Sequence, residues 1–171
     1  MKNILFVCTG NTCRSAMAKG ILEASLAKDP LLAKQISVDS AGTAVLYSEP
    51  ASSHAVSVLK DQWNIDLSNH RSKGLNERLV EKSDLILTMT CGHKDAVLLK
   101  YPMLMSKVST LKEYVTEGKF LPGLESFNDS PDISDPYGMS LEIYQRCAME
   151  IKTAVDKLVF KLKKSPGGDL K

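Results

Sequence analysis

The sequence predicts a single α/β domain in which helices cover both faces of a four-stranded parallel sheet. Short apolar runs alternate with segments of helical periodicity, and 171 residues suit one domain with a full core. Helical crossovers between successive strands favour a parallel sheet. We expect the domain to span residues 1–162, followed by a flexible tail over 163–171.

The individual elements follow from periodicity and composition. Strands are expected at 3–7, 36–39, 84–89 and 108–111, of which the first and third are almost wholly apolar. Helices are expected at 15–28, 51–63, 75–82, 93–100 and 140–162. The last is the clearest, because its apolar residues keep a helical period throughout and Ser140 is a suitable N-cap. Residues 117–134, rich in Gly, Pro, Asp and Ser, predict a long surface loop.

Composition argues against several classes of function. A net charge of +2 gives no case for a nucleic-acid or membrane partner, and no apolar run approaches the roughly 20 residues of a membrane span. No signal peptide is recognisable, and four scattered cysteines do not make a disulfide framework, so a cytoplasmic protein is expected. The three histidines are too far apart for zinc-ligand spacing, and neither a metal nor an organic cofactor is expected.

The most informative segment is residues 8–15, Cys-Thr-Gly-Asn-Thr-Cys-Arg-Ser, which joins the first strand to the first helix. The backbone N–H groups of such a turn converge on one point, and the helix N-terminus adds its positive end. The planar guanidinium of Arg14 suits two oxygens of a tetrahedral anion. The sequence therefore predicts a phosphate site with Cys8 beneath the anion, formed by Thr9, Gly10, Asn11, Thr12, Cys13, Arg14 and Ser15.

A phosphate held over a cysteine suggests catalysis. Donors that hold an anion also favour a thiolate, and the Ser15 hydroxyl is placed to stabilise Cys8 as nucleophile and as leaving group. We expect attack of Cys8 on phosphorus and hydrolysis of a phosphocysteine intermediate. A buried cysteine beside a salt-bridged Arg14 is the structural alternative, which the combined pattern disfavours. For Cys13, a reversible disulfide with Cys8 and simple packing in the loop both stay open.

Dephosphorylation also requires a proton donor. Asp135, Pro136 and Tyr137 end the long loop just before the last helix, where a carboxyl group can reach the anion site. We expect Asp135 to be the general acid of the first step and the general base of the second.

Together, the N-terminal Cys-x5-Arg-Ser loop and the late Asp-Pro resemble the low-molecular-weight protein tyrosine phosphatase family, as does the segment 39–43, Asp-Ser-Ala-Gly-Thr. The resemblance covers the chain from the first strand to the last helix. It implies a flavodoxin-like fold, the activity of a hydrolase, and a network in which Asn11, Ser15, Ser40 and His70 shape the phosphate loop. Ala16 departs from the Pro that many members carry there, with little effect expected.

Thr12 is the best indication of the substrate. Tyrosine-directed members usually carry a larger apolar residue there, whereas bacterial members resembling protein arginine phosphatases carry Thr in the same eight-residue string. A β-branched Thr presents a methyl group and a hydroxyl that suit a polar guanidino leaving group. Phosphoarginine in proteins is therefore the expected substrate, with phosphotyrosine as the alternative that Tyr137 supports. Leu46 and Tyr47 are expected at the pocket rim, and phosphate or sulfate is expected to occupy the site.

Two further functions are less favoured. A thioredoxin-coupled arsenate reductase of this family needs two more cysteines in one mid-chain segment, where only Cys91 is present. A non-catalytic phosphate-binding or phosphocarrier module would use the loop without needing Ser15 or Asp135.

Overall fold

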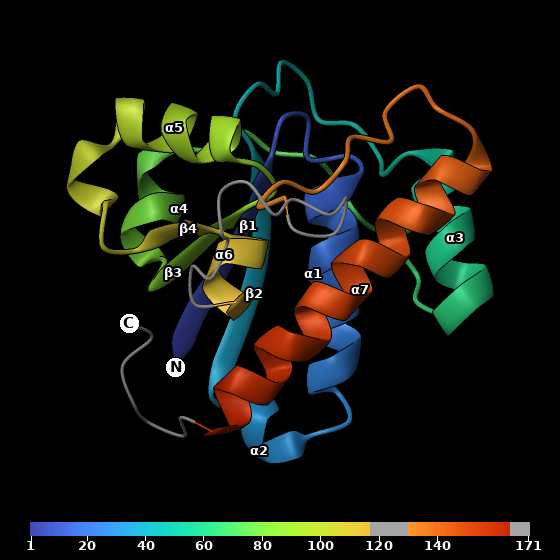
Figure 1. Ribbon diagram of the computed structural model, residues 1–171, viewed down its shortest axis with the longest axis horizontal. Coiled ribbons are helices and arrows are strands. Elements are labelled where there is room, and N and C mark those ends of the chain that lie inside the picture. Colours follow the sequence, from blue (N-terminus) through green and yellow to red (C-terminus); the bar gives the residue numbers. More distant parts are fainter. Residues whose placement is uncertain (117–129, 165–171) are drawn as a thin grey trace.

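The computed structural model describes residues 1–116 and 130–164. Their strands form one four-stranded parallel sheet. The strand order is β2-β1-β3-β4, with β1 at Lys2–Cys8, β2 at Ile36–Gly42, β3 at Leu85–Thr88 and β4 at Val108–Thr110. All three pairings are parallel, so the carboxyl ends of the strands share one edge of the sheet (Figure 1). The predicted fold class is confirmed.

Helices cover both faces of this sheet. On one side lie α1 (Arg14–Leu26) and α7 (Leu141–Lys164), with α3 (Ser53–Trp63) and α6 (Leu111–Thr116) packed against α7. On the other lie α4 (Glu77–Lys82) and α5 (Cys91–Lys100) (Figure 1). Alternation along β1 creates two cores, because Phe6 faces the α1 and α7 side whereas Leu5 and Val7 face the α4 and α5 side.

The structure also differs from the sequence prediction in several elements. Three short helices, α2 (Pro30–Ala33), η1 (Pro102–Leu104) and α6, are not among the predicted elements, since so few residues show no periodicity. Leu111 was assigned to the fourth strand but begins α6. The proposed domain boundary at Leu162 falls inside α7, which continues to Lys164. Most of the proposed tail, 165–171, and most of the proposed loop, 117–129, lie outside the described residues.

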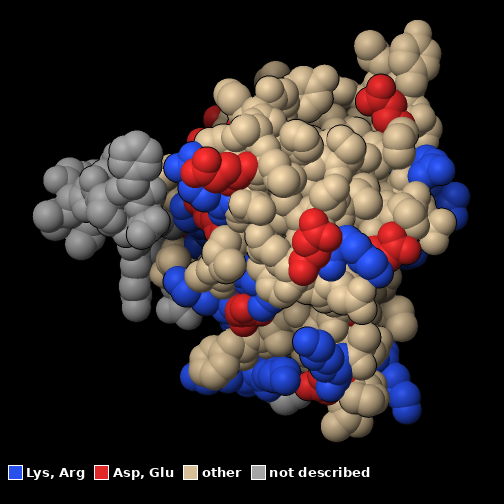
Figure 2. All heavy atoms as spheres, turned by 90° about the vertical axis from the view of Figure 1, so that its right-hand side faces the viewer, with Lys and Arg blue, Asp and Glu red and all other residues tan. Residues whose placement is uncertain are grey.

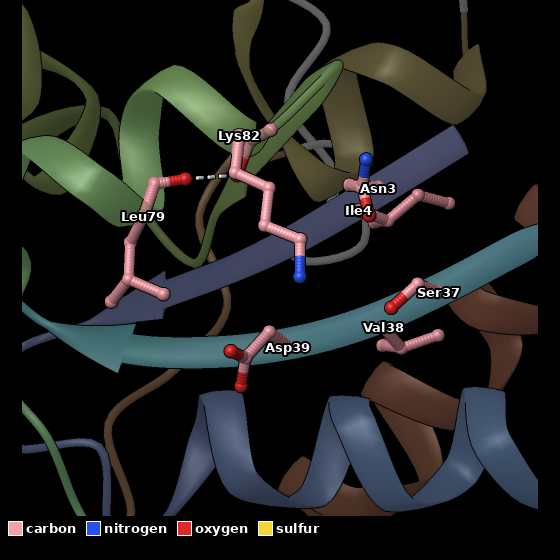
Figure 3. A pocket seen from close by; sticks show the side chains of 8 residues that line it. Asn3, Ile4, Ser37, Val38, Asp39, Leu79 and Lys82 are labelled. Atoms are coloured by element: carbon pink, nitrogen blue, oxygen red, sulfur yellow. Dashed lines mark hydrogen bonds between the residues drawn. The ribbon is translucent and has the colours of Figure 1, made fainter. Parts of the chain in front are cut away.

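The face of the molecule that Figure 2 shows gives little indication of a charged partner. On the face that carries α3 and α7, acidic and basic side chains are interspersed, with uncharged surface between them (Figure 2). A cavity of about 50 Å³ lies beside the first half of β1 and β2, with the Lys82 ammonium pointing into it (Figure 3). No residue predicted to bind phosphate lines this cavity.

Within the described ranges, no helix is long and apolar enough to cross a membrane.

Gly42, the last residue of β2, is required by close packing against the loop that follows β1. A Cβ atom at this position would collide with the Thr9 carbonyl oxygen, approach Val45 Cγ2 to 2.6 Å and lie 3.1 Å from the Asn11 nitrogen. The first and third of these atoms belong to the backbone and cannot move independently. The end of β2 therefore supports the loop over residues 9–11 directly.

We predict that Gly42→Ala destabilises the protein by about 1–3 kcal/mol, since overpacking forces backbone shifts. Denaturant unfolding monitored by circular dichroism measures this change. Gly92→Ala is the matched control, because a Cβ there meets the Thr90 hydroxyl oxygen at an ordinary 3.8 Å and lies within α5. That control should be neutral or slightly stabilising. Equal stabilities for the two variants would contradict the proposed packing constraint.

Candidate active site

The eight-residue motif forms the turn from β1 into α1 at the carboxyl edge of the sheet. Cys8 ends β1, pairs in register with Gly42 and is only 3% exposed. Helix α1 begins at Arg14 and has no acidic residue in its first turn. Its positive N-terminal end is therefore not neutralised by a carboxylate of the helix itself.

Two donors are directed at the Cys8 sulfur. The Asn11 backbone N–H lies 3.3 Å from Sγ, and the Ser15 hydroxyl oxygen lies 3.0 Å from it. Ser15 Oγ accepts a hydrogen bond from Asn11 Nδ2 at 2.9 Å, and its own proton has two acceptors, the sulfur at 3.0 Å and the more distant Ala41 carbonyl at 3.5 Å. This arrangement suits a thiolate, because a charged acceptor strengthens both hydrogen bonds.

Asn11 holds the loop through its side chain and its backbone conformation. Its φ of 57° is left-handed, a region that asparagine tolerates better than most residues. The amide nitrogen donates to both Ser15 Oγ and Ser40 Oγ at 2.9 Å, and the amide oxygen accepts from the Lys73 N–H at 3.0 Å. Asn11 is completely buried, so these partners satisfy polar groups that water cannot reach.

His70 completes the network from the segment that precedes α4. Its Nε2 lies 2.6 Å from the Asn11 carbonyl oxygen. Since a carbonyl can only accept, Nε2 carries the proton. Burial lowers the pKa of His70, favouring the neutral ring. The family resemblance implies one network of Asn11, Ser15, Ser40 and His70. The structure brings all four together.

Arg14 and Asp135 meet although 121 residues separate them. Arg14 Nη2 lies 2.6 Å from Asp135 Oδ2, and the two side chains are 5% and 52% exposed. The nearly buried guanidinium also donates from Nη1 to the Ile133 carbonyl at 3.3 Å. The cation of the predicted anion site and the predicted proton donor are thus in direct contact.

Anchors on both sides hold the segment that carries Asp135. The Ile133 N–H donates to the Met89 carbonyl at 2.8 Å, and its side chain is 1% exposed. The prediction of a surface loop throughout 117–134 is therefore wrong at Ile133, which is a core residue although the segment around it is rich in Gly, Pro, Asp and Ser. Cys147 of α7 donates to the Ser134 carbonyl at 3.4 Å, and burial raises the pKa of this thiol to about 12.

Lys112 of α6 adds a further anchor, which sequence reasoning missed. Its ammonium donates to the Asp132 carbonyl at 3.2 Å and to Glu150 at 2.8 Å. The Asp132 carboxylate in turn accepts from the Cys91 N–H at 2.7 Å. The sequence does not indicate this role for a lysine in a short helix, because the role depends on tertiary contacts with residues far along the chain.

Cys13 is buried, and none of the four cysteines forms a disulfide. Its sulfur lies 3.1 Å from the Tyr144 hydroxyl of α7. Burial raises the pKa of Tyr144 to about 12, so this phenol stays protonated. The His54 ring meets the Tyr144 ring edge-on, with centroids 5.2 Å apart. The structure shows Cys13 packed in the loop, and the reversible disulfide with Cys8 stays a prediction.

The residues proposed for specificity differ in exposure. Thr12 is half-buried, with its hydroxyl 3.6 Å from Cys13 Sγ. Tyr137 is exposed and donates its backbone N–H to Asp135 Oδ1 at 3.1 Å. Leu46 and Tyr47 are 90% and 80% exposed. In the described part of the chain, no group of three or more His, Cys, Asp or Glu side chains is arranged to hold a metal ion.

We predict that Asn11→Ala destabilises the protein by about 2–4 kcal/mol, because it leaves buried partners unsatisfied. Turnover should fall as well, since the loop loses its support. Asn64→Ala is the matched control: Asn64 also has a left-handed φ, of 54°, but is exposed at the end of α3. It should lose only about 1 kcal/mol. Chemical denaturation of both variants provides the comparison, and similar losses would contradict a special role for the Asn11 amide.

Comparison with known proteins places this site among phosphatases. The chain is 37% identical over 161 residues to a protein-arginine-phosphatase of Geobacillus stearothermophilus, covering 93% of this chain and 95% of the relative. It is 44% identical to the crystal structure of a low molecular weight protein tyrosine phosphatase from T. tengcongensis, with a TM-score of 0.80 and coverage of 95% and 100%. A structure of YwlE arginine phosphatase with a phosphorylated serine in place of the active-site cysteine matches at 36% identity, with a TM-score of 0.82 and coverage of 95% and 96%. The model of the low molecular weight phosphotyrosine protein phosphatase family matches residues 3–167, and the chain belongs to that family.

Proposed function

We propose that this protein hydrolyses phosphoarginine in proteins, in preference to phosphotyrosine, through a phosphocysteine intermediate on Cys8. The observation that carries the proposal is the contact between Arg14 and Asp135 beside the loop that ends at Ser15. This contact supports the proposal because it brings a cation suited to phosphate and a carboxyl group suited to proton transfer together beside a loop that begins with a cysteine. Support for the substrate comes from the likeness to arginine phosphatases over more than nine tenths of the chain.

In the first step the Cys8 thiolate attacks phosphorus as the P–N bond of phosphoarginine breaks. An S–P bond forms, and Asp135 transfers its proton to the departing guanidino nitrogen. Backbone N–H groups of residues 9–15 and the Arg14 guanidinium stabilise the charge on the three phosphoryl oxygens.

In the second step water attacks the phosphocysteine. Asp135, now a carboxylate, takes a proton from this water, the S–P bond breaks, and inorganic phosphate leaves. The electron pair returns to the Cys8 sulfur, where the Ser15 hydroxyl at 3.0 Å and the Asn11 N–H at 3.3 Å stabilise it. The same two donors therefore favour the nucleophile and the leaving group.

The Arg14–Asp135 ion pair has a consequence for substrate binding. Without an anion, Asp135 neutralises the nearly buried guanidinium. A phosphoryl dianion offers Arg14 a bidentate partner of higher charge. Substrate then replaces the carboxylate, and Asp135, released from the guanidinium, takes up a proton from solvent beside the leaving group, so binding and proton donation are coupled.

Thr12 supports the preference for phosphoarginine over phosphotyrosine. Its half-buried side chain offers a hydroxyl beside a polar leaving group and a methyl group that narrows the space for an aromatic ring. Asp135 attracts the cationic guanidinium product. Tyr137, exposed next to Asp135, favours phosphotyrosine as the second candidate substrate, because its ring is placed to contact another aromatic ring.

The remaining expectations belong to the same proposal. Its partners are phosphorylated proteins, with phosphate or sulfate occupying the loop when no substrate is bound. Cytoplasmic location is proposed because the scattered thiols of the chain suit a reducing compartment.

Replacing Asp135 by Asn should lower kcat for phosphoarginine by about 10²–10⁴-fold, the usual contribution of general acid–base catalysis. Asp156→Asn, at an exposed site on α7, is the matched control and should keep full activity. Stopped-time assays of phosphate release measure both variants. If Asp135→Asn retains wild-type turnover, Asp135 is not the proton donor; if even the wild type releases no phosphate, a phosphate-binding module is the better description.

The substrate is tested by kcat/KM for phosphoarginine and phosphotyrosine side by side, with Cys8→Ser as the blank. Phosphoarginine should be preferred, and Thr12→Ile should shift the ratio toward phosphotyrosine by about 10–100-fold. Thr153→Ile, at an exposed site on α7, should leave the ratio unchanged. A wild-type preference for phosphotyrosine would overturn the arginine proposal and leave the cysteine mechanism standing.

A further inference from the structure

His93 has no assigned role, yet it connects α5 to the phosphate loop. It is 8% exposed, and its Nε2 lies 2.8 Å from the Thr9 hydroxyl oxygen, in the residue that follows Cys8. Its Nδ1 lies 2.8 Å from the hydroxyl oxygen of Thr90, the N-cap of α5. Both ring nitrogens are therefore engaged, one by the element that carries the imidazole and the other by the loop.

The surroundings of His93 favour a neutral ring. Burial and the positive charge of Arg14 lower its pKa, and the smaller effects of Asp135 and Asp132 oppose this only in part. A neutral imidazole has one N–H donor and one acceptor nitrogen. The ring therefore donates to one of the two threonine hydroxyls and accepts from the other, and the two possible proton orders correspond to protonation at Nδ1 or at Nε2.

Thr90 helps to choose between these orders. One lone pair of its hydroxyl oxygen is used to accept from the His93 backbone N–H at 3.2 Å, and donation of its own proton to Nδ1 completes its hydrogen bonding. Nε2 then carries the ring proton and donates it to the Thr9 oxygen. In this order the Thr9 hydroxyl accepts from His93 and keeps its own proton for another acceptor.

We propose that Thr90, His93 and Thr9 form a hydrogen-bond relay that directs the Thr9 hydroxyl proton toward the phosphoryl group bound in the loop. His93 is a positioning residue, because it acts through Thr9, whereas Thr9 contacts the anion. The relay rests on the proposed function only in that the anion is a phosphoryl group.

The relay also explains why Thr9 differs from the other loop residues. Thr9 is exposed at the mouth of the loop, where a free threonine side chain would rotate among its rotamers. The contact with His93 fixes its hydroxyl from a helix on the opposite face of the sheet from α1. Two separate sets of contacts then hold the loop, one made by the Asn11 amide and one made by His93.

The test measures binding of inorganic phosphate by calorimetry in a double-mutant cycle. His93→Phe and Thr9→Val should each weaken phosphate binding by about tenfold, the usual loss for one hydrogen bond to a charged group. Because His93 acts through Thr9, the double variant should bind no more weakly than Thr9→Val alone. His93→Gln, which keeps an N–H donor near the position of Nε2, should recover part of the affinity. Asp95→Ala, exposed on the same helix, should bind like the wild type.

Losses that multiply to about a hundredfold in the double variant would show that His93 acts independently of Thr9 and would overturn the relay. An unchanged affinity in Thr9→Val would do the same. Nitrogen-15 NMR of His93 should show the neutral tautomer protonated at Nε2, and protonation at Nδ1 would overturn the proton order. These measurements need no turnover, so an absence of phosphoarginine hydrolysis would contradict the proposed function without deciding on the relay.

Discussion

The left-handed backbone of Asn11, fixed by its buried amide, is the constraint on which the site depends. With φ at 57°, the chain turns so that the Asn11 N–H faces the Cys8 sulfur. The amide keeps this conformation by bonding Ser15, Ser40 and the Lys73 backbone, which come from α1, β2 and the segment before α4. An anion site whose donors are already aligned needs no reorganisation when charge arrives, and this preorganisation gives electrostatic catalysis its effect.

The parallel sheet explains how distant segments of the chain reach one site. Cys8 and Thr88 end adjacent strands, and Met89 follows directly and holds Ile133 through its carbonyl. Asp135 thus arrives beside Arg14 because its segment is fastened to the carboxyl end of β3, as ligand sites in such folds require. Anchors from α6 and α7, through Lys112 and Cys147, fix the segment on its other side. The segment that carries Asp135, the residue proposed as proton donor, is therefore anchored to three elements of the fold.

Local chemistry allowed the sequence to predict much of this arrangement. The apolar run before Cys8 and the Cys-x5-Arg-Ser pattern predicted the loop and its place at the end of β1, and the alternation of elements predicted the sheet. Contacts that depend on tertiary packing could not be predicted: Ile133 is buried although its neighbours are turn-forming residues, and His93 meets Thr9 across 84 positions. For His93 only one weak signal existed, namely Thr90 three residues earlier, a spacing typical of a helix N-cap.

Crystal structures of the wild-type protein without an anion and with inorganic phosphate test the central claim most directly. If Asn11 fixes the loop before the substrate arrives, the backbone of residues 8–15 should agree within about 1 Å, and Asn11 should stay left-handed in both. Arg14 should leave Asp135 and bind two phosphate oxygens, since it is the one member of the site that we expect to change partners. A loop that refolds around phosphate, or an Asn11 that becomes left-handed only when the anion is bound, would contradict the account.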